Sequence, residues 1–315
     1  MLLTRPQLES LFDRINLPHE TKVDLKQPGG GSNALAALTR LQQYTQSFVP
    51  FENTALHYSV HRLFELDVPS LYRKIVDDNE GGLCFQITRL FLYVLKSLGY
   101  TVYPTAGRIN HTVSVNASGA DNRPVFGDWA HMVLIVTITG QKYLVDFSFG
   151  PNAPVSPVPL VANVVEPDMK PRRRRLVYSN INQNADPDQR YWRLQLSNDP
   201  SKDEWFDSYA FKEQEFLMPD YDNIQLGFRH SRVAWFMYKV MAYRVLLDDN
   251  GVPAGWYMMW EHVVRKSWHG KVTVVEKGMG EPERVIALKK YFNITVSETG
   301  KKAIKGSFGA LRAQL

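Results

Sequence analysis

The amino-acid sequence predicts an α+β protein with a helical first third, a sheet in the middle and a mixed last third. Helical spacing of apolar residues dominates residues 1–100. After Gly99 the pattern changes to short runs in which apolar and polar residues alternate, which is typical of strands. A chain of 315 residues is too long for one simple core, so we expect two or three domains.

The helices of the first third carry their own start signals. Thr4 followed by Pro6 predicts the cap and first turn of the first helix. Asn33 is expected to cap a second long helix over 34–47, and a turn at 68–70 precedes a short helix over 71–76.

The only cysteine, Cys84, opens the most apolar helix of the chain, which is expected over 83–98 with Gly99 closing it. This helix is apolar nearly all round, so it should be buried. Its first-turn N–H groups and its dipole favour an anion, so a thiolate is stabilised there. A cysteine in this position is either an inert core residue or a nucleophile, and a nucleophile needs a base elsewhere in the chain.

Runs with a period of two predict the strands of the middle third, at 100–103, 113–115, 131–138, 142–147 and 191–196. The segment 150–171, rich in proline and small residues, is expected to be a crossing loop. The last third is expected to hold a helix near 207–216, strands over 233–247, 256–266 and 272–277, and a closing helix over 284–292.

The strands 131–138 and 142–147 predict a hairpin that turns at Thr139-Gly140. With two central turn residues, His131 and Asp146 become diagonal neighbours on one face, about 7–8 Å apart at Cα. Asp146 lies among apolar residues, where a carboxylate is costly unless it is paired. We therefore expect a hydrogen bond between His131 and Asp146; the alternative is an edge strand with the aspartate in water.

The composition is ordinary for a globular protein, with 44% hydrophobic and 22% charged residues. No membrane span, nucleic-acid partner or metal site is expected, and one cysteine excludes an internal disulfide. The expected location is the reducing cytoplasm. The net charge of +5 weakly favours anionic partners. The basic run Arg172–Arg175 is expected to be a solvated loop, or else a contact to a phosphate-bearing ligand or a localisation signal.

Four motifs, in the right order, resemble those of the arylamine N-acetyltransferase family. They are Val49-Pro50-Phe51-Glu52-Asn53, Gly81-Gly82-Leu83-Cys84, His131-Met132-Val133-Leu134-Ile135-Val136 and Val145-Asp146-Phe147-Ser148-Phe149-Gly150. In the family the second motif reads Arg-Gly-Gly-x-Cys and the fourth Val-Asp-Val-Gly-Phe-Gly. The resemblance covers nearly the whole chain, which is identified as a member of this family, with a divergent fungal member as one option.

The resemblance implies three domains around a Cys-His-Asp core like that of papain-like proteases. These are a helical bundle over 1–99 that carries the nucleophile, an antiparallel β-barrel over 100–212 that carries the histidine and aspartate, and an α/β lid over 213–315. In this arrangement Cys84 is the nucleophile, His131 the base and Asp146 the group that orients the base.

The resemblance also implies a ping-pong transfer from acyl-CoA, by default acetyl-CoA, to an arylamine, arylhydrazine or aryl hydroxylamine. An aromatic acceptor pocket is expected from Phe51, Trp129, Phe149 and Gly150. Phe51 and Phe149 match family positions that line the site, and Trp129 shares a strand face with His131 if that strand begins early.

Three residues beside the cysteine depart from the family pattern. Glu80, Gln86 and Thr88 stand where the family has arginine, glutamate and asparagine. A negative charge near a thiol disfavours the thiolate, so a catalytically weakened small-molecule binder is one alternative. A thiol amidohydrolase or protease with the same triad is the other. The acyl group (acetyl, propionyl or malonyl), the natural amine, the coenzyme A contacts and the oligomeric state are left open.

Overall fold

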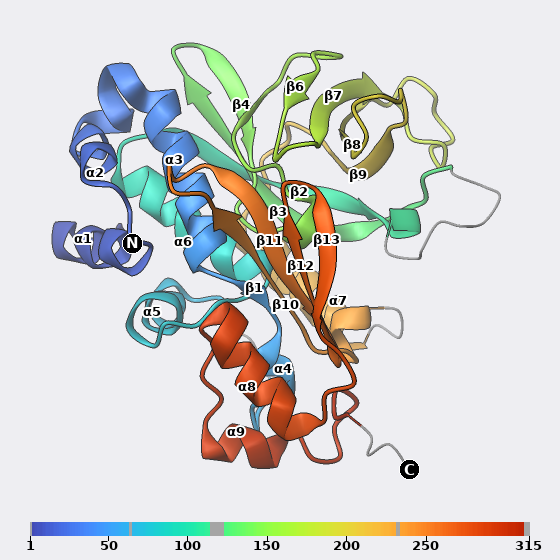
Figure 1. Ribbon diagram of the computed structural model, residues 1–315. Helices are drawn as coiled ribbons and strands as arrows, with labels where there is room; N and C mark the ends of the chain where they lie inside the picture. The colour runs from blue at the N-terminus through green and yellow to red at the C-terminus, as the bar shows by residue number, and fades with distance from the viewer. Residues whose placement is uncertain (1, 63–64, 114–122, 231–233, 312–315) are drawn as a thin grey trace.

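The computed structural model describes the chain apart from residues 1, 63–64, 114–122, 231–233 and 312–315. Figure 1 shows three regions: helices on the left, a large sheet at the top and a second sheet in front that leads down to the last helices. The helices of the first region are α1 (Arg5–Arg14), α2 (His19–Leu25), α3 (Ala34–Phe48), α4 (Thr54–His57), α5 (Val68–Tyr72) and α6 (Cys84–Ser97). No helix in the described residues is long and apolar enough to cross a membrane.

The predicted helix starts are mostly confirmed. The Thr4 side chain accepts a hydrogen bond from the Gln7 backbone, with proline in the first turn of α1. The short helix predicted over 71–76 is instead α5, followed by a π-helical turn at Arg73–Asp77. The predicted cap at Asn33 is wrong, because its side chain makes no capping bond.

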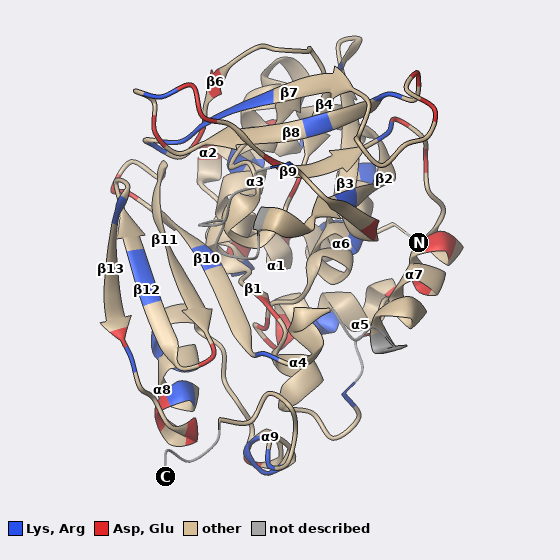
Figure 2. Cartoon of the chain, turned by 90° about the vertical axis from the view of Figure 1, so that its right-hand side faces the viewer, with Lys and Arg blue, Asp and Glu red and all other residues tan. Residues whose placement is uncertain are grey.

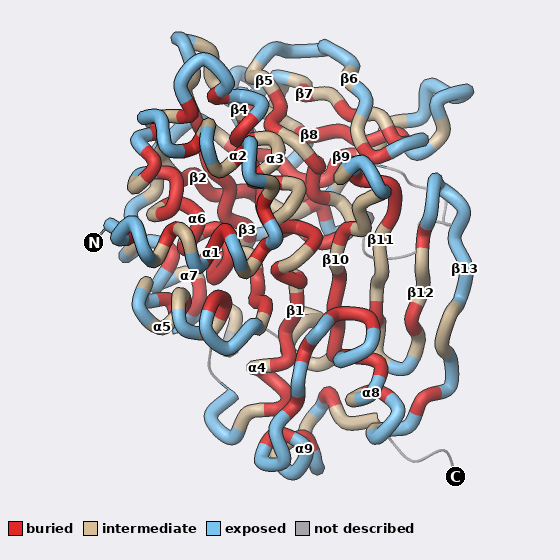
Figure 3. The backbone as a smooth tube through the Cα atoms, turned by 60° about the vertical axis from the view of Figure 1, so that its left-hand side comes forward, coloured by how far each residue is buried: buried red, intermediate tan, exposed pale blue. Residues whose placement is uncertain are grey.

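Helix α6 is the buried centre of the molecule, as its apolar pattern predicts. Its residues Leu90, Phe91, Val94 and Leu95 have no exposed surface, and Figure 3 shows α6 enclosed with strands β2 (Thr101–Asn110) and β3 (Phe126–Ile138). The helix begins at Cys84, so the tight packing of its body fixes where its first turn points.

The large sheet has eight strands in the order β5-β4-β3-β2-β9-β8-β7-β6. Its other members are β4 (Gln141–Val145), β5 (Val158–Pro159), β6 (Glu166–Pro167), β7 (Arg173–Ser179), β8 (Tyr191–Ser197) and β9 (Phe206–Phe211). Among the described residues no pairing joins β5 to β6, so the sheet is a curled half-barrel that stays open at this side.

Two secondary-structure predictions in this region are wrong. The helix expected near 207–216 is β9, because these residues pair with β2 on one side and with β8 on the other. A helix, α7 (Met218–His230), follows it. The strand expected at 113–115 is a 3₁₀ turn over His111–Val113, and its last two residues lie outside the described part of the chain.

The second sheet takes one strand from the first third of the chain. Its order is β1 (Phe51–Glu52), β10 (Met241–Leu247), β11 (Pro253–Trp260), β12 (Val263–Trp268) and β13 (Lys271–Glu276). The single strand predicted over 256–266 is therefore wrong: it is a hairpin that turns at Glu261, where φ is 54°. The predicted strand over 233–247 begins only at Met241, after a 3₁₀ turn at Trp235–Met237, and residue 233 is outside the described residues.

Helices α8 (Glu281–Phe292) and α9 (Glu298–Ala303) follow the second sheet, and Leu288 of α8 packs with Ala242 and Met259 of its strands. Because β1 pairs with β10 and Tyr221 of α7 contacts Phe85 of α6, the three regions share buried contacts. The domain boundaries at 99 and 212 stay a prediction.

The prediction of a solvated loop at Arg172–Arg175 is wrong, and the alternatives of a contact to a phosphate-bearing ligand or a localisation signal stay predictions. Arg172 and Arg174 are buried and both pair with the fully buried Asp168. Arg172 also donates to Ala153 O (2.7 Å) and Arg174 to Ser156 O (2.7 Å), so the pair fastens the crossing loop. Although burial alone would raise it, these two guanidinium groups lower the pKa of Asp168.

The other two arginines of the run lie on the opposite face of the strand. Arg173 and Arg175 lie over the ring of Trp205, with guanidinium-to-centroid distances of 5.3 and 4.1 Å. All four cations therefore have partners within the chain, and Figure 2 shows the basic stretch of β7 at the top of the molecule.

We expect Asp168→Asn to lower the free energy of unfolding by about 3–5 kcal/mol, because it leaves the buried Arg172 without its anion and Arg174 with only the partly exposed Glu166. Denaturant unfolding monitored by circular dichroism measures the change. Glu298→Gln is the matched control: it removes an exposed partner of Lys301 and should leave the free energy of unfolding nearly unchanged. Equal unfolding free energies for the two variants would contradict a structural role for the arginine run.

Candidate active site

Cys84 occupies the first position of α6 and is half-buried, with its Sγ 3.8 Å from the carbonyl oxygen of Ala130. The glycines before it allow a close backbone contact. Gly82 exchanges main-chain hydrogen bonds with the Pro50–Glu52 segment, and a Cβ on Gly81 would lie 1.9 Å from Pro50 O. The Pro-Phe-Glu-Asn and Gly-Gly motifs thus contact each other through their backbones, and this contact positions the thiol.

His131 and Asp146 form the hydrogen bond that the hairpin pattern predicts. Leu134 pairs with Val145 in the predicted register. His131 Nε2 lies 2.8 Å from Asp146 Oδ2, and both side chains are completely buried. His131 Nδ1 has no partner with full hydrogen-bond geometry among the described residues, and the imidazole interacts with Cys84.

The electrostatics of this pair favour a charged imidazole. Burial opposes the charge, but Asp146 and, to a smaller extent, Cys84 outweigh it and raise the pKa of His131 to about 9. At neutral pH the arrangement therefore favours an imidazolium held by the Asp146 carboxylate beside the thiol.

Asp146 is fixed by several bonds besides the one to His131. Its Oδ1 accepts from the backbone of Ser148 at 2.9 Å. Gln42 and Gln46 of α3 donate to its main-chain oxygen at 3.0 and 2.9 Å, and both also donate to Pro154 O. Sequence reasoning missed these glutamines; their signal is a four-residue spacing on the buried side of an otherwise apolar helix face.

Three of the four predicted pocket residues lie near one another. Phe149 is half-buried, with its ring centroid 4.4 Å from that of His131. Gly150 has φ of +61°, and a Cβ there would touch the Phe51 ring at 3.4 Å. Tyr209, which the sequence did not single out, packs its ring at 5.0 Å from His131. Burial and, next, Asp146 raise the pKa of its hydroxyl well above the ordinary value.

The prediction that Trp129 shares a face with His131 is wrong, and its place in the acceptor pocket stays a prediction. The strand does begin early, but a bulge at Ala130 pairs His131 with Gly107 and Trp129 with the next residue, Arg108. Gly107 and Arg108 are consecutive on β2, so the residues paired with them lie on opposite faces of the sheet. Trp129 therefore stacks on Arg108 and contacts Tyr191 on the face opposite to His131.

The residues that depart from the family pattern each have a partner within the chain. Gln86 Oε1 accepts from Leu83 N at 3.2 Å, within the first turn of α6. The hydroxyl of Thr88 lies 3.0 Å from that of Ser148, which ties α6 to the segment after Asp146. Glu80 pairs with a lysine at 2.9 Å, so its charge is partly neutralised.

Comparisons with known proteins show the family and the fold of this chain. A sequence model of the N-acetyltransferase family matches residues 34–301. An N-malonyltransferase of Gibberella moniliformis is 28% identical over 316 residues, which cover 96% of this chain and 92% of that protein. The arylamine N-acetyltransferase structure from Mycobacterium abscessus has a TM-score of 0.76 at 20% identity, over 95% of this chain and 93% of its own. The Mycobacterium marinum arylamine N-acetyltransferase in complex with CoA has a TM-score of 0.74 at 24% identity, over 96% and 100%. These matches confirm the predicted fold.

We expect Cys84 in the unmodified protein to react with iodoacetamide below neutral pH, and Asp146→Asn to slow this reaction at pH 6 by about tenfold or more. The sign follows from His131: its pKa is raised, so the imidazolium that stabilises a thiolate is present at low pH and is lost only near pH 9. The alkylation rate measured against pH tests this. The exposed Asp128, changed to asparagine, is the control; identical profiles for all three proteins would show that Asp146 is only structural.

Proposed function

The chain belongs to the arylamine N-acetyltransferase family, and from this we propose that it is a CoA-dependent arylamine N-acyltransferase. The acyl group passes from acyl-CoA through a thioester on Cys84 to an arylamine, arylhydrazine or aryl hydroxylamine. The observation that carries the proposal is the half-buried thiol at the start of α6 beside a buried His131–Asp146 pair. The CoA bound to a structural neighbour supports acyl-CoA as the co-substrate.

In the proposed mechanism His131 accepts the thiol proton and Cys84 Sγ attacks the carbonyl carbon of the acyl thioester. The carbon–sulfur bond to the donor breaks, and His131 returns the proton to the leaving thiolate. In the second half the amine nitrogen attacks the Cys84 thioester, His131 takes the amine proton, and the cysteine leaves. Asp146 remains ionised throughout and stabilises the imidazolium.

Two acyl groups are candidates. Acetyl is the expectation from the family. Malonyl is favoured by the N-malonyltransferase of Gibberella moniliformis, which aligns with 96% of this chain. The same Cys84 chemistry serves both, because the carboxylate of a malonyl group lies beyond the reacting carbonyl.

The alternatives of a hydrolase and of a weakened binder have less support. A transferase must keep water from its acyl-enzyme, and the rings of Phe149 and Tyr209 that pack against His131 supply apolar surface beside the base. A weakened binder was suggested only by Glu80, Gln86 and Thr88, and all three have partners within the chain. The proposal includes a reducing compartment such as the cytoplasm, because the nucleophile must stay a free thiol, and a role in xenobiotic metabolism.

We expect Cys84→Ser to lower acyl transfer by about a thousandfold or more, because the hydroxyl is a far weaker nucleophile than a thiolate. Intact-protein mass spectrometry after mixing with acetyl-CoA or malonyl-CoA should show an adduct on the unmodified protein and none on the variant. The donor whose adduct forms faster is the preferred acyl group. Near-normal turnover by Cys84→Ser, or a failure of both donors to acylate the protein, would end the proposal.

We also expect flat aromatic amines to be better acceptors than alkyl amines of matched basicity, since each ring contact contributes about 0.5–1.5 kcal/mol beyond area burial. Phe149→Leu should reduce this preference by about tenfold or less. Rates with aniline-type and alkyl acceptors measure it, and Trp129→Leu is the comparison, because Trp129 lies on the other face of β3. Equal rates for both acceptor classes in the unmodified protein would mean that these rings only pack the core.

A further inference from the structure

Behind the nucleophile lies a buried cation that the proposed mechanism does not use. Lys74, on the π-helical turn Arg73–Asp77, places its Nζ 3.0 Å from Glu52 Oε1, 2.9 Å from Glu80 Oε2 and 2.6 Å from the carbonyl oxygen of Gly81. One ammonium group thus contacts the Pro-Phe-Glu-Asn motif and the cysteine motif together. A lysine has three N–H donors, and all three are used here.

The Lys74 ammonium group neutralises the charge of the buried Glu52 carboxylate. Its side chain is 1% exposed, and its other oxygen, Oε2, accepts from the backbone and the hydroxyl of Thr54. Burial alone would raise the pKa of Glu52, but Lys74 and these hydrogen bonds lower it. In turn, Glu52 and Glu80 outweigh burial and raise the pKa of Lys74, so the lysine stays charged. Removing the cation alone would leave a buried carboxylate unpaired.

The contact to Gly81 connects this charge cluster to the thiol. Gly81 is three residues before Cys84, and Gly82 is already bonded to the backbone of Pro50 and Glu52 on the other side. The short loop before α6 is therefore held by main-chain bonds along one edge and by an ammonium group at Gly81 O.

We propose that Lys74 is a positioning residue for Cys84: it supplies from the preceding helical turn the cation that this chain lacks at position 80, where the family motif has arginine. Glu80, which replaces that arginine, becomes a second counter-ion of Lys74. The charge reversal at position 80 is thus compensated within the same cluster. For its acyl-transfer readout the inference rests on the proposed function.

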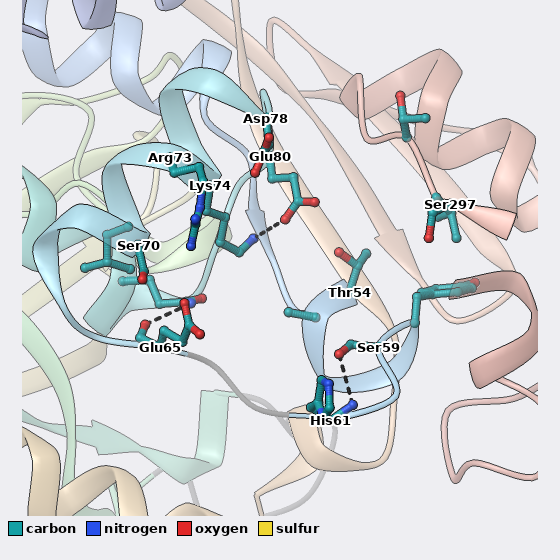
Figure 4. Close-up of a pocket in the computed structure, with 16 residues that line it drawn as sticks. Thr54, Ser59, His61, Glu65, Ser70, Arg73, Lys74, Asp78, Glu80 and Ser297 are labelled. Carbon is teal, nitrogen blue, oxygen red and sulfur yellow. Dashed lines mark hydrogen bonds and ion pairs between the residues drawn. The ribbon is translucent and has the colours of Figure 1, made fainter. Parts of the chain in front are cut away.

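The two carboxylate partners of Lys74 differ in exposure, and Figure 4 shows the side on which Glu80 lies. Lys74 and Glu80 line a cavity of about 410 Å³ between residues 54–61, residues 65–80 and the segment 295–297. The Glu80 side chain is 40% exposed there, whereas Glu52 is enclosed. An arginine at position 80 can therefore reach the space that the Lys74 ammonium now fills, because Glu80 Oε2 already lies 2.9 Å from it.

The test removes the cation from position 74 and then introduces one at position 80. Lys74→Met should slow the alkylation of Cys84 by iodoacetamide and the acyl transfer by about tenfold or more, since a misplaced nucleophile loses its alignment. Lys74→Met with Glu80→Arg should restore both rates to within about threefold of the unmodified protein. Lys142→Met, which removes an exposed lysine paired with Glu213, is the control and should change neither rate.

Alkylation needs no acyl donor, so it tests Lys74 even if the proposed function fails. Where Lys74→Met alone does not fold, Glu52→Gln with Lys74→Met removes both buried charges and keeps the comparison possible. This double variant should still react slowly, because Gly81 O has lost its donor. Unmodified alkylation rates in Lys74→Met or in Glu52→Gln/Lys74→Met, or a folded Lys74→Met/Glu80→Arg protein that stays slow, would overturn the inference.

Discussion

The Asp146 carboxylate has no exposed surface. A buried carboxylate must be paired and hydrogen-bonded, so the neighbours of Asp146 have to lie in fixed positions. Its oxygens accept from His131 and from the Ser148 backbone, and its own main-chain oxygen is held by two glutamines of α3. The curled sheet supplies the histidine, the helical region supplies the glutamines, and α6 brings the thiol to the imidazole. Asp146 is therefore held in place only when the sheet, α3 and α6 are packed together. The chemistry at Cys84 depends on this packing.

Buried charges in the described residues are paired, and three of these clusters hold irregular segments in place. Asp146 is paired with His131, Asp168 with Arg172 and Arg174, and Lys74 with Glu52 and Glu80. Each cluster fastens a segment without regular secondary structure: the residues after Asp146, the crossing loop and the loop before Cys84. Irregular segments have backbone groups that a helix or sheet would satisfy, and charged side chains satisfy them here instead.

The sequence predicted the parts of the site that depend on local pattern. The parity of the β3–β4 hairpin placed His131 beside Asp146, and the apolar run after Cys84 placed the thiol at a helix start. Contacts between distant segments were not predictable in this way. The bulge at Ala130 arises from pairing with β2, and β9 is a strand only because it has two partner strands. The burial of Arg172 and Arg174 depends on Asp168 in the folded loop, and the run of four arginines in the sequence does not indicate this pairing.

Strand β1 is only two residues long, yet it has a consequence for how the chain is made. Phe51 and Glu52 pair with Tyr243 and Ala242, and the neighbouring Asn53 bonds to Met241, which is 188 residues away. A nascent chain emerging from the ribosome therefore exposes this edge, and the aromatic surface of Phe85 that Tyr221 covers, long before their partners are synthesised. Contacts of such high sequence separation close slowly, so β10 joins β1 late in folding. A chain terminated before β10 carries Cys84 and its loop but leaves Phe51 and Glu52 without their strand partners.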